Sequence, residues 1–310
     1  MKPASFDYVV PRTVAEAVEA LGDTGRKAQV LAGGQSLILE MHLHRIRPER
    51  VVDINRIPEL DRMCVEGGEL RVGALVRHAA FEAADAVPGP LGALLSRAVV
   101  NIAHPPIRSR GTMAGSFAYA HPASEWCAIG VALDATVEVT GPAGAREIAA
   151  DGYFLGPNRT ARRPEELITA VRLPLLGERT GVGFIEHRRT HFCFAQVAVA
   201  AVLTVHDGVV GDARIGLVNS ADHPVRARAA ERTLIGAEFG PPPTRRRLPD
   251  DHPFARAGRV AAQEDAAPVA EPYADAAYKR QAVAVLVGRT LREAAADLRA
   301  RLAAREGDHR

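Results

Sequence analysis

The chain has 310 residues, 47% of them apolar and 25% charged, which indicates a globular protein long enough for two or three domains. Its 39 basic and 37 acidic side chains leave a net charge of +2. This balance excludes a strongly polyanion-seeking protein and gives no argument for nucleic acid or a membrane surface as a partner. We expect no membrane span, since no apolar run approaches ~18–20 residues, and no signal peptide.

Cysteine and histidine usage limits the cofactors that the chain can hold. Cys64, Cys127 and Cys193 are widely separated and form no CxxC pair, so we expect reduced thiols and a cytoplasmic protein. Three scattered cysteines cannot supply the four thiolates of a typical iron–sulfur cluster. None of the 11 histidines belongs to a metal-binding motif, so we also predict no metal site.

Hydrophobic periodicity predicts a small α/β unit at the N-terminus. Thr13 and Glu16 form a capping box, in which Glu16 can reach back to the Thr13 N–H, and apolar residues from Val14 to Leu21 follow helical spacing. Short apolar strands are expected at 29–32 and 51–54.

The rest of the chain alternates between short strands and helices. We expect strands at 70–74, 135–139, 168–173, 182–186, 196–205 and 213–218, and helices at 91–99, 225–234 and 278–302. Residues 101–124 are turn formers and small residues without clear periodicity.

The first candidate site is the segment Leu31-Ala32-Gly33-Gly34-Gln35-Ser36-Leu37, which follows a predicted strand. Glycines let a ligand approach the backbone closely, and successive N–H groups with a serine hydroxyl can bind an anion. The segment is neither a GxGxxG fingerprint nor a Walker loop. A plain strand-to-helix turn is the alternative, because Gly-Gly pairs are common in turns.

The second candidate site is the long stretch of small residues at 111–125. Its opening segment, Gly111-Thr112-Met113-Ala114-Gly115-Ser116, follows the basic Arg108 and Arg110. Its small residues could lie against an extended ligand while Thr112 and Ser116 donate to phosphate oxygens. Alone, it could equally be a packed loop between domains. Two such segments in one chain favour a pyrophosphate held from two sides.

Taken together, these motifs identify a family. The chain resembles the FAD-binding medium subunit of the molybdenum hydroxylases, which include carbon monoxide dehydrogenase and xanthine dehydrogenase. The resemblance covers nearly the whole chain and is strongest at Ile102-Ala103-His104-Pro105-Pro106-Ile107-Arg108-Ser109-Arg110 and the second segment. It continues in Glu166-Leu167-Ile168, Phe194-Ala195 and Tyr278-Lys279-Arg280.

The resemblance implies an α+β fold with a two-lobed FAD-binding domain of the PCMH type, followed by a small C-terminal domain with a three-stranded sheet and helices. The implied domains are an N-terminal lobe at 1–54, a second lobe at 55–176, a C-terminal domain at 177–290 and a helical tail at 291–310.

The resemblance also implies site residues. Leu31, Ala32, Gly33, Gly34, Gln35, Ser36 and Leu37 would wrap the pyrophosphate of FAD, and Thr112, Met113, Ala114, Gly115 and Ser116 would hold it from the other side. Ile102 and Ile168 would be apolar contacts near the flavin, and Glu125 would accept from a ribose or ribityl hydroxyl. No residue of this chain is expected to be catalytic.

The implied function is electron transfer. FAD would receive electrons from the [2Fe-2S] clusters of a small partner chain and pass them to an external acceptor, while a large molybdopterin-binding chain acts on the organic substrate. A dimer of heterotrimers is expected.

Four features depart from the family pattern. Ala114 replaces one of two adjacent glycines, His121 stands where many members have Asp, and Phe192-Cys193 lies in a segment that often reads Arg-Arg-x-Gly-Asp-Phe. Ile185 aligns where some members place a lysine near the flavin. Two alternatives therefore stay open: a stand-alone flavin oxidoreductase, for which His104 or Tyr119 could be tried as catalytic groups, and a non-redox assembly subunit that has lost FAD.

Overall fold

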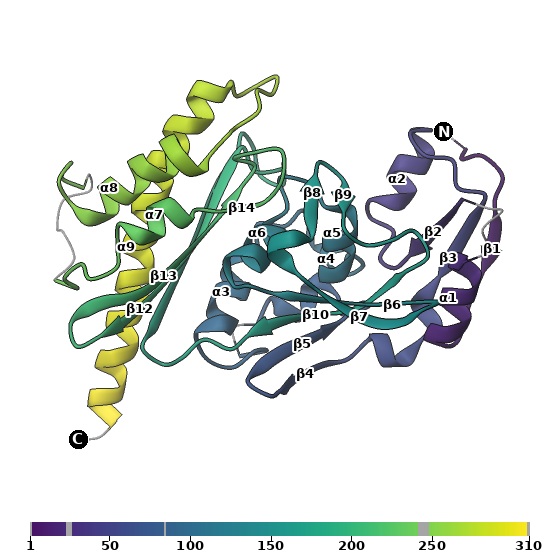
Figure 1. The fold of residues 1–310 in the computed structure, drawn as a ribbon, viewed down its shortest axis with the longest axis horizontal. Coiled ribbons are helices and arrows are strands. Elements are labelled where there is room, and N and C mark those ends of the chain that lie inside the picture. The colour runs from purple at the N-terminus through teal and green to yellow at the C-terminus, as the bar shows by residue number, and fades with distance from the viewer. Residues whose placement is uncertain (1, 23–26, 84, 241–247, 309–310) are drawn as a thin grey trace. The chain divides into compact units, whose positions relative to one another are not determined.

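The computed structural model describes residues 2–22, 27–83, 85–240 and 248–308 (Figure 1). The chain folds into two compact units, each built from several stretches of sequence. Unit 1 comprises residues 1–80, 104–120 and 134–174, and unit 2 comprises residues 81–103, 121–133 and 175–310. In the described part of the chain, no helix has the length and apolar character needed to cross a membrane.

Unit 1 begins with a three-stranded parallel sheet in the order β1-β3-β2. Its strands and helices are β1 (Asp7–Val9), α1 (Val14–Gly22), β2 (Ala28–Leu31), α2 (Leu37–His42) and β3 (Arg50–Asp53). The Thr13 hydroxyl accepts the Glu16 N–H at 3.2 Å, as the capping box predicts, but the Glu16 carboxylate accepts from the Arg12 N–H at 2.7 Å and not from Thr13. These bonds fix the start of α1, which buries Ala17, Val18 and Leu21.

A five-stranded antiparallel sheet in the order β4-β5-β10-β6-β7 forms the larger part of unit 1. Its strands are β4 (Met63–Glu66), β5 (Glu69–Gly73), β6 (Thr136–Gly141), β7 (Gly144–Ala149) and β10 (Leu167–Pro174). Burial alternates along β6, so Val137 and Val139 face the core while Glu138 lies on the other face.

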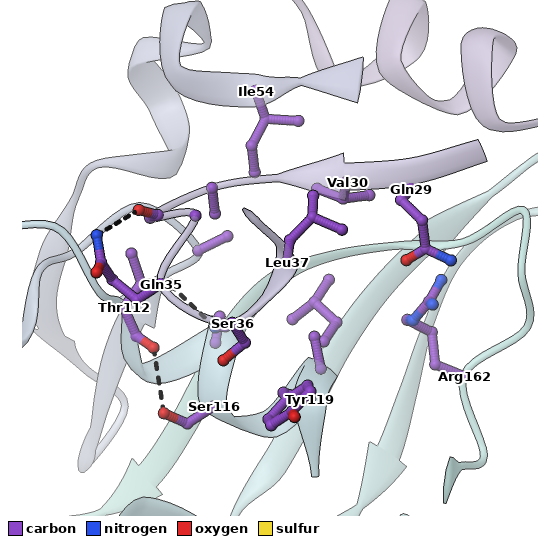
Figure 2. Close-up of a pocket in the computed structure, with 18 of the residues that line it drawn as sticks. Gln29, Val30, Gln35, Ser36, Leu37, Ile54, Thr112, Ser116, Tyr119 and Arg162 are labelled. Carbon is purple, nitrogen blue, oxygen red and sulfur yellow. Dashed lines mark hydrogen bonds between the residues drawn. The ribbon is translucent and has the colours of Figure 1, made fainter. Parts of the chain in front are cut away.

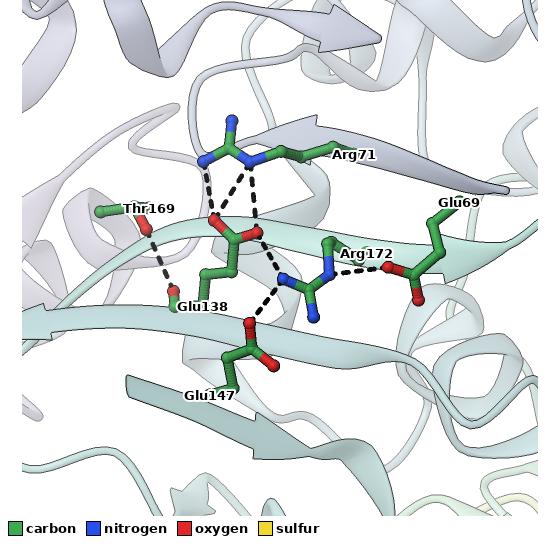
Figure 3. A network of polar contacts seen from close by, with 6 residues as sticks. All are labelled: Glu69, Arg71, Glu138, Glu147, Thr169 and Arg172. Carbon is green, nitrogen blue, oxygen red and sulfur yellow. Dashed lines mark hydrogen bonds and ion pairs between the residues drawn. The ribbon is translucent and has the colours of Figure 1, made fainter. Parts of the chain in front are cut away.

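The polar face of this sheet carries a network of ion pairs (Figure 3). Glu138 on β6 accepts from Arg71 on β5 at 2.7 Å and from Arg172 on β10 at 3.1 Å. Arg172 also contacts Glu69 at 2.9 Å and Glu147 at 2.7 Å. Opposite charges on neighbouring strands support the observed register over four of the five strands.

Short elements complete unit 1. They are η1 (Ile54–Arg56), η2 (Pro58–Leu60), η4 (Ala150–Gly152), α4 (Pro105–Arg108), α5 (Met113–Tyr119) and the hairpin of β8 (Phe154–Gly156) and β9 (Arg159–Thr160), with η3 (His78–Phe81) at the junction with unit 2. The structure corrects the expectation for residues 101–124, because α4, α5 and the cap of α6 all fall there. α5 has only seven residues, so one apolar pair a turn apart, Met113 and Phe117, is too short a pattern to identify a helix.

Unit 2 is organised around a four-stranded antiparallel sheet in the order β11-β12-β13-β14. The strands are β11 (Thr180–His187), β12 (Val197–His206), β13 (Val209–Val218) and β14 (Val225–Arg226). The sequence predicted three strands for this sheet, and the structure adds a fourth, the short β14, which pairs with Gly216 and Leu217 of β13. The prediction of a helix over 225–234 is too long, because Val225 and Arg226 pair with the open edge of β13 and only α7 (Arg228–Arg232) is helical.

Helices cover both faces of this sheet, which explains why β12 is apolar almost throughout. The remaining helical elements are α3 (Gly89–Val99), α6 (Glu125–Ala132), α8 (Pro253–Val260), η5 (Ala261–Asp265) and α9 (Ala276–Asp308). α9 approaches β11 so closely that a Cβ at Gly181 would lie 2.0 Å from the Ala294 carbonyl oxygen. On the opposite face, a Cβ at Gly216 would lie 2.5 Å from the Ala128 carbonyl oxygen of α6.

Candidate functional site

Unit 1 contains a cavity of about 570 Å³ (Figure 2). Its wall combines the end of β2, the segment 32–37, the start of α5 and the strand β10 with the segment that precedes it. Ligand sites in proteins commonly measure about 300–1,000 Å³, so this cavity has the size of a cofactor site.

The first candidate segment is the connection from β2 to α2. Gly34 has a φ of +76°, a conformation that side chains rarely adopt. A Cβ at Gly33 would lie 2.2 Å from the Arg110 carbonyl oxygen and 2.7 Å from the Gly111 Cα, so Gly33 packs directly on the chain that leads into the second segment. The Gln35 side-chain amide donates to the Gly33 carbonyl at 3.2 Å. The segment is thus a strand-to-helix turn, and it also lines the cavity.

The second candidate segment is the start of α5 and not a loop. Thr112 caps this helix, and its hydroxyl accepts the Gly115 N–H at 2.9 Å. Ser116 lies one turn later and donates to the Thr112 carbonyl at 3.5 Å. Ala114 is an ordinary helical residue, so the loss of the family's glycine places no strain on the backbone.

A chain of hydrogen bonds holds the two segments together. The Asn55 side-chain amide donates to the Ala32 carbonyl at 2.9 Å, and its oxygen accepts from Arg77 at 2.7 Å. Arg77 also donates to the Arg110 carbonyl at 2.8 Å. Asn55 and Arg77 therefore fix the distance between the glycine pair and the residues that precede α5.

His78 forms part of the cavity wall behind the second segment. Its backbone N–H donates to the Gly111 carbonyl at 2.9 Å, and a Cβ at Gly111 would lie 2.7 Å from the imidazole ring. Burial, and then the nearby charges of Arg108 and Arg77, lower the pKa of His78 to about 4. The ring is therefore neutral at pH 7 and adds no charge to the cavity.

Another part of the wall carries polar side chains from α2, α5 and the chain before β10. The Glu40 carboxylate accepts from Tyr119 at 3.2 Å and from Arg45 at 3.1 Å. Burial and the charge of Glu40 raise the pKa of Tyr119, so its hydroxyl stays protonated and can donate. Arg162 points toward Gln29 in Figure 2. These groups give the wall both donors and acceptors.

Eleven of the fifteen predicted site residues line this one cavity. They are Ala32, Gly33, Gly34, Gln35, Ser36, Leu37, Thr112, Ala114, Gly115, Ser116 and Ile168. The other four lie elsewhere: Leu31 is in β2, Met113 is buried at 1% exposure, and Ile102 and Glu125 belong to unit 2.

Sequence reasoning missed the residues that position the two segments. Asn55 directly follows the predicted strand at 51–54, and a polar residue at a strand end was a usable signal. Arg77 and His78 carry no local signal, because their role depends on contacts across 33 residues of chain. Among the described residues, no group of three or more His, Cys, Asp or Glu side chains is arranged to bind a metal ion.

Known families match most of the chain. Residues 4–176 match the family described as the FAD binding domain in molybdopterin dehydrogenase, and residues 184–294 match the CO dehydrogenase flavoprotein C-terminal domain. The chain is 35% identical to the alpha subunit of the 6-hydroxypseudooxynicotine dehydrogenase complex of Paenarthrobacter nicotinovorans, over 95% of this chain and 96% of that one. It is 33% identical to the carbon monoxide dehydrogenase medium chain of Afipia carboxidovorans, over 96% and 99% of the two chains.

Solved structures agree with this assignment. A chain of carbon monoxide dehydrogenase from Hydrogenophaga pseudoflava superposes with a TM-score of 0.88 at 34% identity, covering 96% of this chain and 99% of that one. A chain of quinoline 2-oxidoreductase from Pseudomonas putida 86 gives 0.84 at 26% identity, covering 95% and 98%. The predicted α+β fold, with an FAD-binding domain followed by a C-terminal domain, is confirmed.

The fold and cavity thus define a flavoprotein, and the matches define which kind. This chain belongs to the family of FAD-binding medium subunits of molybdenum hydroxylases. FAD is its cofactor, and it is an oxidoreductase subunit whose role is electron transfer.

Proposed function

We propose that the cavity of unit 1 holds the pyrophosphate of FAD between the two glycine-containing segments. Leu31–Leu37 wrap it from one side, and Thr112–Ser116 hold it from the other. The contact of Gly33 with the Arg110 and Gly111 backbone carries this proposal, because it brings both segments to one cavity without an intervening side chain.

The donors in the cavity fit a phosphate ligand. Ser36, Thr112 and Ser116 place hydroxyl groups along the two segments (Figure 2). The hydroxyls of Ser36 and Thr112 can donate to a phosphate oxygen, and that of Ser116 can do so in place of its 3.5 Å bond to the Thr112 carbonyl. Backbone N–H groups beside glycine can approach an anion closely, since no Cβ intervenes. The neutral His78 and the apolar Ile168 make one part of the wall uncharged, which suits a ring system, while Glu40, Arg45 and Arg162 make another part polar.

Further site residues are proposed on the family resemblance. Ile168 would contact the flavin side of the cofactor from the cavity wall. Ile102 would pack near the flavin, and Glu125 would accept from a ribose or ribityl hydroxyl. The proposed domains keep the boundaries 1–54, 55–176, 177–290 and 291–310.

When bound, FAD supplies storage for two electrons, while the protein supplies binding, orientation and electrostatics. We propose that the electrons arrive from the [2Fe-2S] clusters of a small partner chain and leave to an external acceptor. A large molybdopterin-binding chain completes the complex, as a dimer of heterotrimers. Cys64, Cys127 and Cys193 form no disulfide in the described part of the chain, which supports a cytoplasmic location.

A reductive experiment on the purified complex tests this function. The chain is tagged and isolated with whatever chains accompany it, the clusters are reduced with dithionite in limiting amount, and flavin absorbance is followed. We expect co-purification of two partner chains and bleaching of the flavin as the clusters are reoxidised. A chain that carries FAD but arrives alone would contradict the subunit role and favour a stand-alone flavin enzyme, whereas a colourless chain would favour an assembly subunit.

A further inference from the structure

The cavity of unit 1 runs along the open edge of β2. This strand stands last in the order β1-β3-β2, so one of its edges has no neighbouring strand within that sheet. Successive side chains of a strand point to opposite faces, yet Ala28, Gln29 and Val30 all line the cavity. The cavity therefore follows the edge of the strand, where backbone N–H and C=O groups are open to a ligand.

Gln29 places a side-chain amide at this edge. The residue is exposed, and its amide makes no hydrogen bond among the described residues. An amide offers both donors and an acceptor. Gln29 precedes Leu31, where the first candidate segment begins, by two residues, which is about 7 Å along a strand. This spacing leaves room for a sugar between the amide and a pyrophosphate at that segment.

Arg162 lies between β9 and β10, lines the same cavity and points toward Gln29 (Figure 2). Its Nη1 atom donates to the backbone carbonyls of Arg163, Pro164 and Glu166 at 2.6–3.3 Å. These bonds fix the guanidinium through one nitrogen. The Nε and Nη2 atoms make no hydrogen bond in the part of the chain that the structure describes, so they remain available to a ligand.

The charge of Arg162 also lacks a counter-charge. Other charged groups of the cavity wall are paired within unit 1. Arg45 contacts Glu40 at 3.1 Å. Glu166 accepts from Arg146 at 2.6 Å. Arg162 is half-buried and has no carboxylate partner among the described residues, which indicates that a ligand supplies the electron-rich group it faces.

An adenine base fits these groups. A glutamine amide can pair with the N6 amino group and the N7 atom of adenine, because it presents a donor and an acceptor side by side. A guanidinium is a flat cation that stacks on aromatic rings. The open edge of β2 adds backbone donors and acceptors beside them.

We propose that Gln29 and Arg162 form the base-recognition end of the cofactor cavity and select the adenine half of FAD. Gln29 pairs with the polar edge of the base, and Arg162 stacks on its face. This inference rests on the proposed function, because it requires the pyrophosphate to lie at the neighbouring glycine segments. Gln29 and Arg162 are then specificity-determining residues, separate from the segments that bind the phosphates.

Calorimetric titration of the full, cofactor-free chain with ADP, GDP and adenosine tests this assignment. The variants are Gln29→Leu and Arg162→Gln, with Arg163→Gln as the control. Arg163 is the next arginine in the chain, but it is exposed and lies outside the cavity lining that the structure describes. Gln29→Leu removes no side-chain hydrogen bond of the described chain, so it remains a clean test even if Arg162→Gln disturbs the backbone that Arg162 holds.

We expect the wild type to prefer ADP over GDP by about tenfold, because a glutamine amide matches adenine and not guanine. Gln29→Leu should lower the affinity for ADP and adenosine by about tenfold and abolish that preference. Arg162→Gln should also weaken the binding of both ADP and adenosine, by about fivefold. The control should leave all three affinities unchanged.

Two results would overturn base recognition. One is a preference for ADP that survives in Gln29→Leu. The other is an Arg162→Gln chain that loses affinity for ADP but keeps its affinity for adenosine, since Arg162 would then be a phosphate contact.

A parallel titration of the wild type with FAD separates this inference from the proposed function. A chain that binds FAD but shows no preference for ADP over GDP refutes the inference and leaves the proposed function standing. A chain that binds neither FAD nor ADP refutes both.

Discussion

Gly33 packs tightly against the Arg110 carbonyl oxygen in the proposed FAD site. Substituting Gly33 with alanine therefore tests the site directly. In Gly33→Ala the new Cβ would lie 2.2 Å from that oxygen, whereas ordinary van der Waals contact begins at about 3.4 Å. The two segments must therefore separate by about 1.2 Å. Arg77 resists this movement, because its side chain ties the Arg110 carbonyl to Asn55.

The size of the effect follows from this geometry. Overpacking a well-packed region typically costs about 1–3 kcal/mol, and a clash with a tethered backbone carbonyl belongs at the upper end of that range. We expect the free energy of unfolding of the cofactor-free chain to fall by about 3 kcal/mol. Because a pyrophosphate must be held from both segments at once, we also expect FAD affinity to fall by about 100-fold, which corresponds to about 3 kcal/mol.

Two assays measure these effects on Gly33→Ala: urea unfolding of the cofactor-free chain and equilibrium titration with FAD. Gly152→Ala is the matched control, since it lies in the same unit and a Cβ there would meet nothing within 4 Å. The reasoning is refuted if Gly33→Ala matches this control in both stability and FAD affinity.

Three further substitutions test the supports of the cavity. Asn55→Ala removes the link between Arg77 and the first segment, and should lower the free energy of urea unfolding by about 2 kcal/mol and weaken FAD binding. The pKa of His78 is about 4 in the folded chain, against 6.5 for an ordinary histidine, so the unfolded chain binds the proton first as the pH falls. The free energy of unfolding should therefore decrease by about 3 kcal/mol between pH 6.5 and pH 4. Urea unfolding at several pH values should show that this decrease is absent in His78→Gln. Thr112→Val removes the helix cap on Gly115 and one hydroxyl donor, and should cost about 1 kcal/mol in unfolding and about tenfold in FAD affinity by titration.

Part of the N-terminal α/β unit was readable from the sequence, although α2 was not. The capping box at Thr13 and the short apolar strands predicted α1, β2 and β3 to within one residue at most ends, because their signals are local. The glycine pair and Ser36 were recognised for the same reason. What local patterns could not supply is the contact that makes them a site, since Gly33 meets Arg110 only after the chain folds.

The errors also have physical causes. α5 was missed because its seven residues are too few to show an apolar period, although Thr112 provided a cap signal. β14 was missed because Val225 and Arg226 directly precede a helical segment, and their pairing with the open edge of β13 is a tertiary contact that no local pattern shows. Arg77 and His78 act by positioning other groups, and no local pattern marks such a role, whereas Asn55 was marked by its place at the end of a predicted strand.

The most direct test of the central claim is a titration of the full, cofactor-free chain with FAD, following the visible absorbance of the flavin and measuring the mass of the cofactor released on denaturation. We predict saturation at one FAD per chain, with FAD as the released molecule, and a loss of saturation in Gly33→Ala that Gly152→Ala does not share. A wild-type chain that takes up no FAD, or that binds it equally well in both variants, would contradict the account.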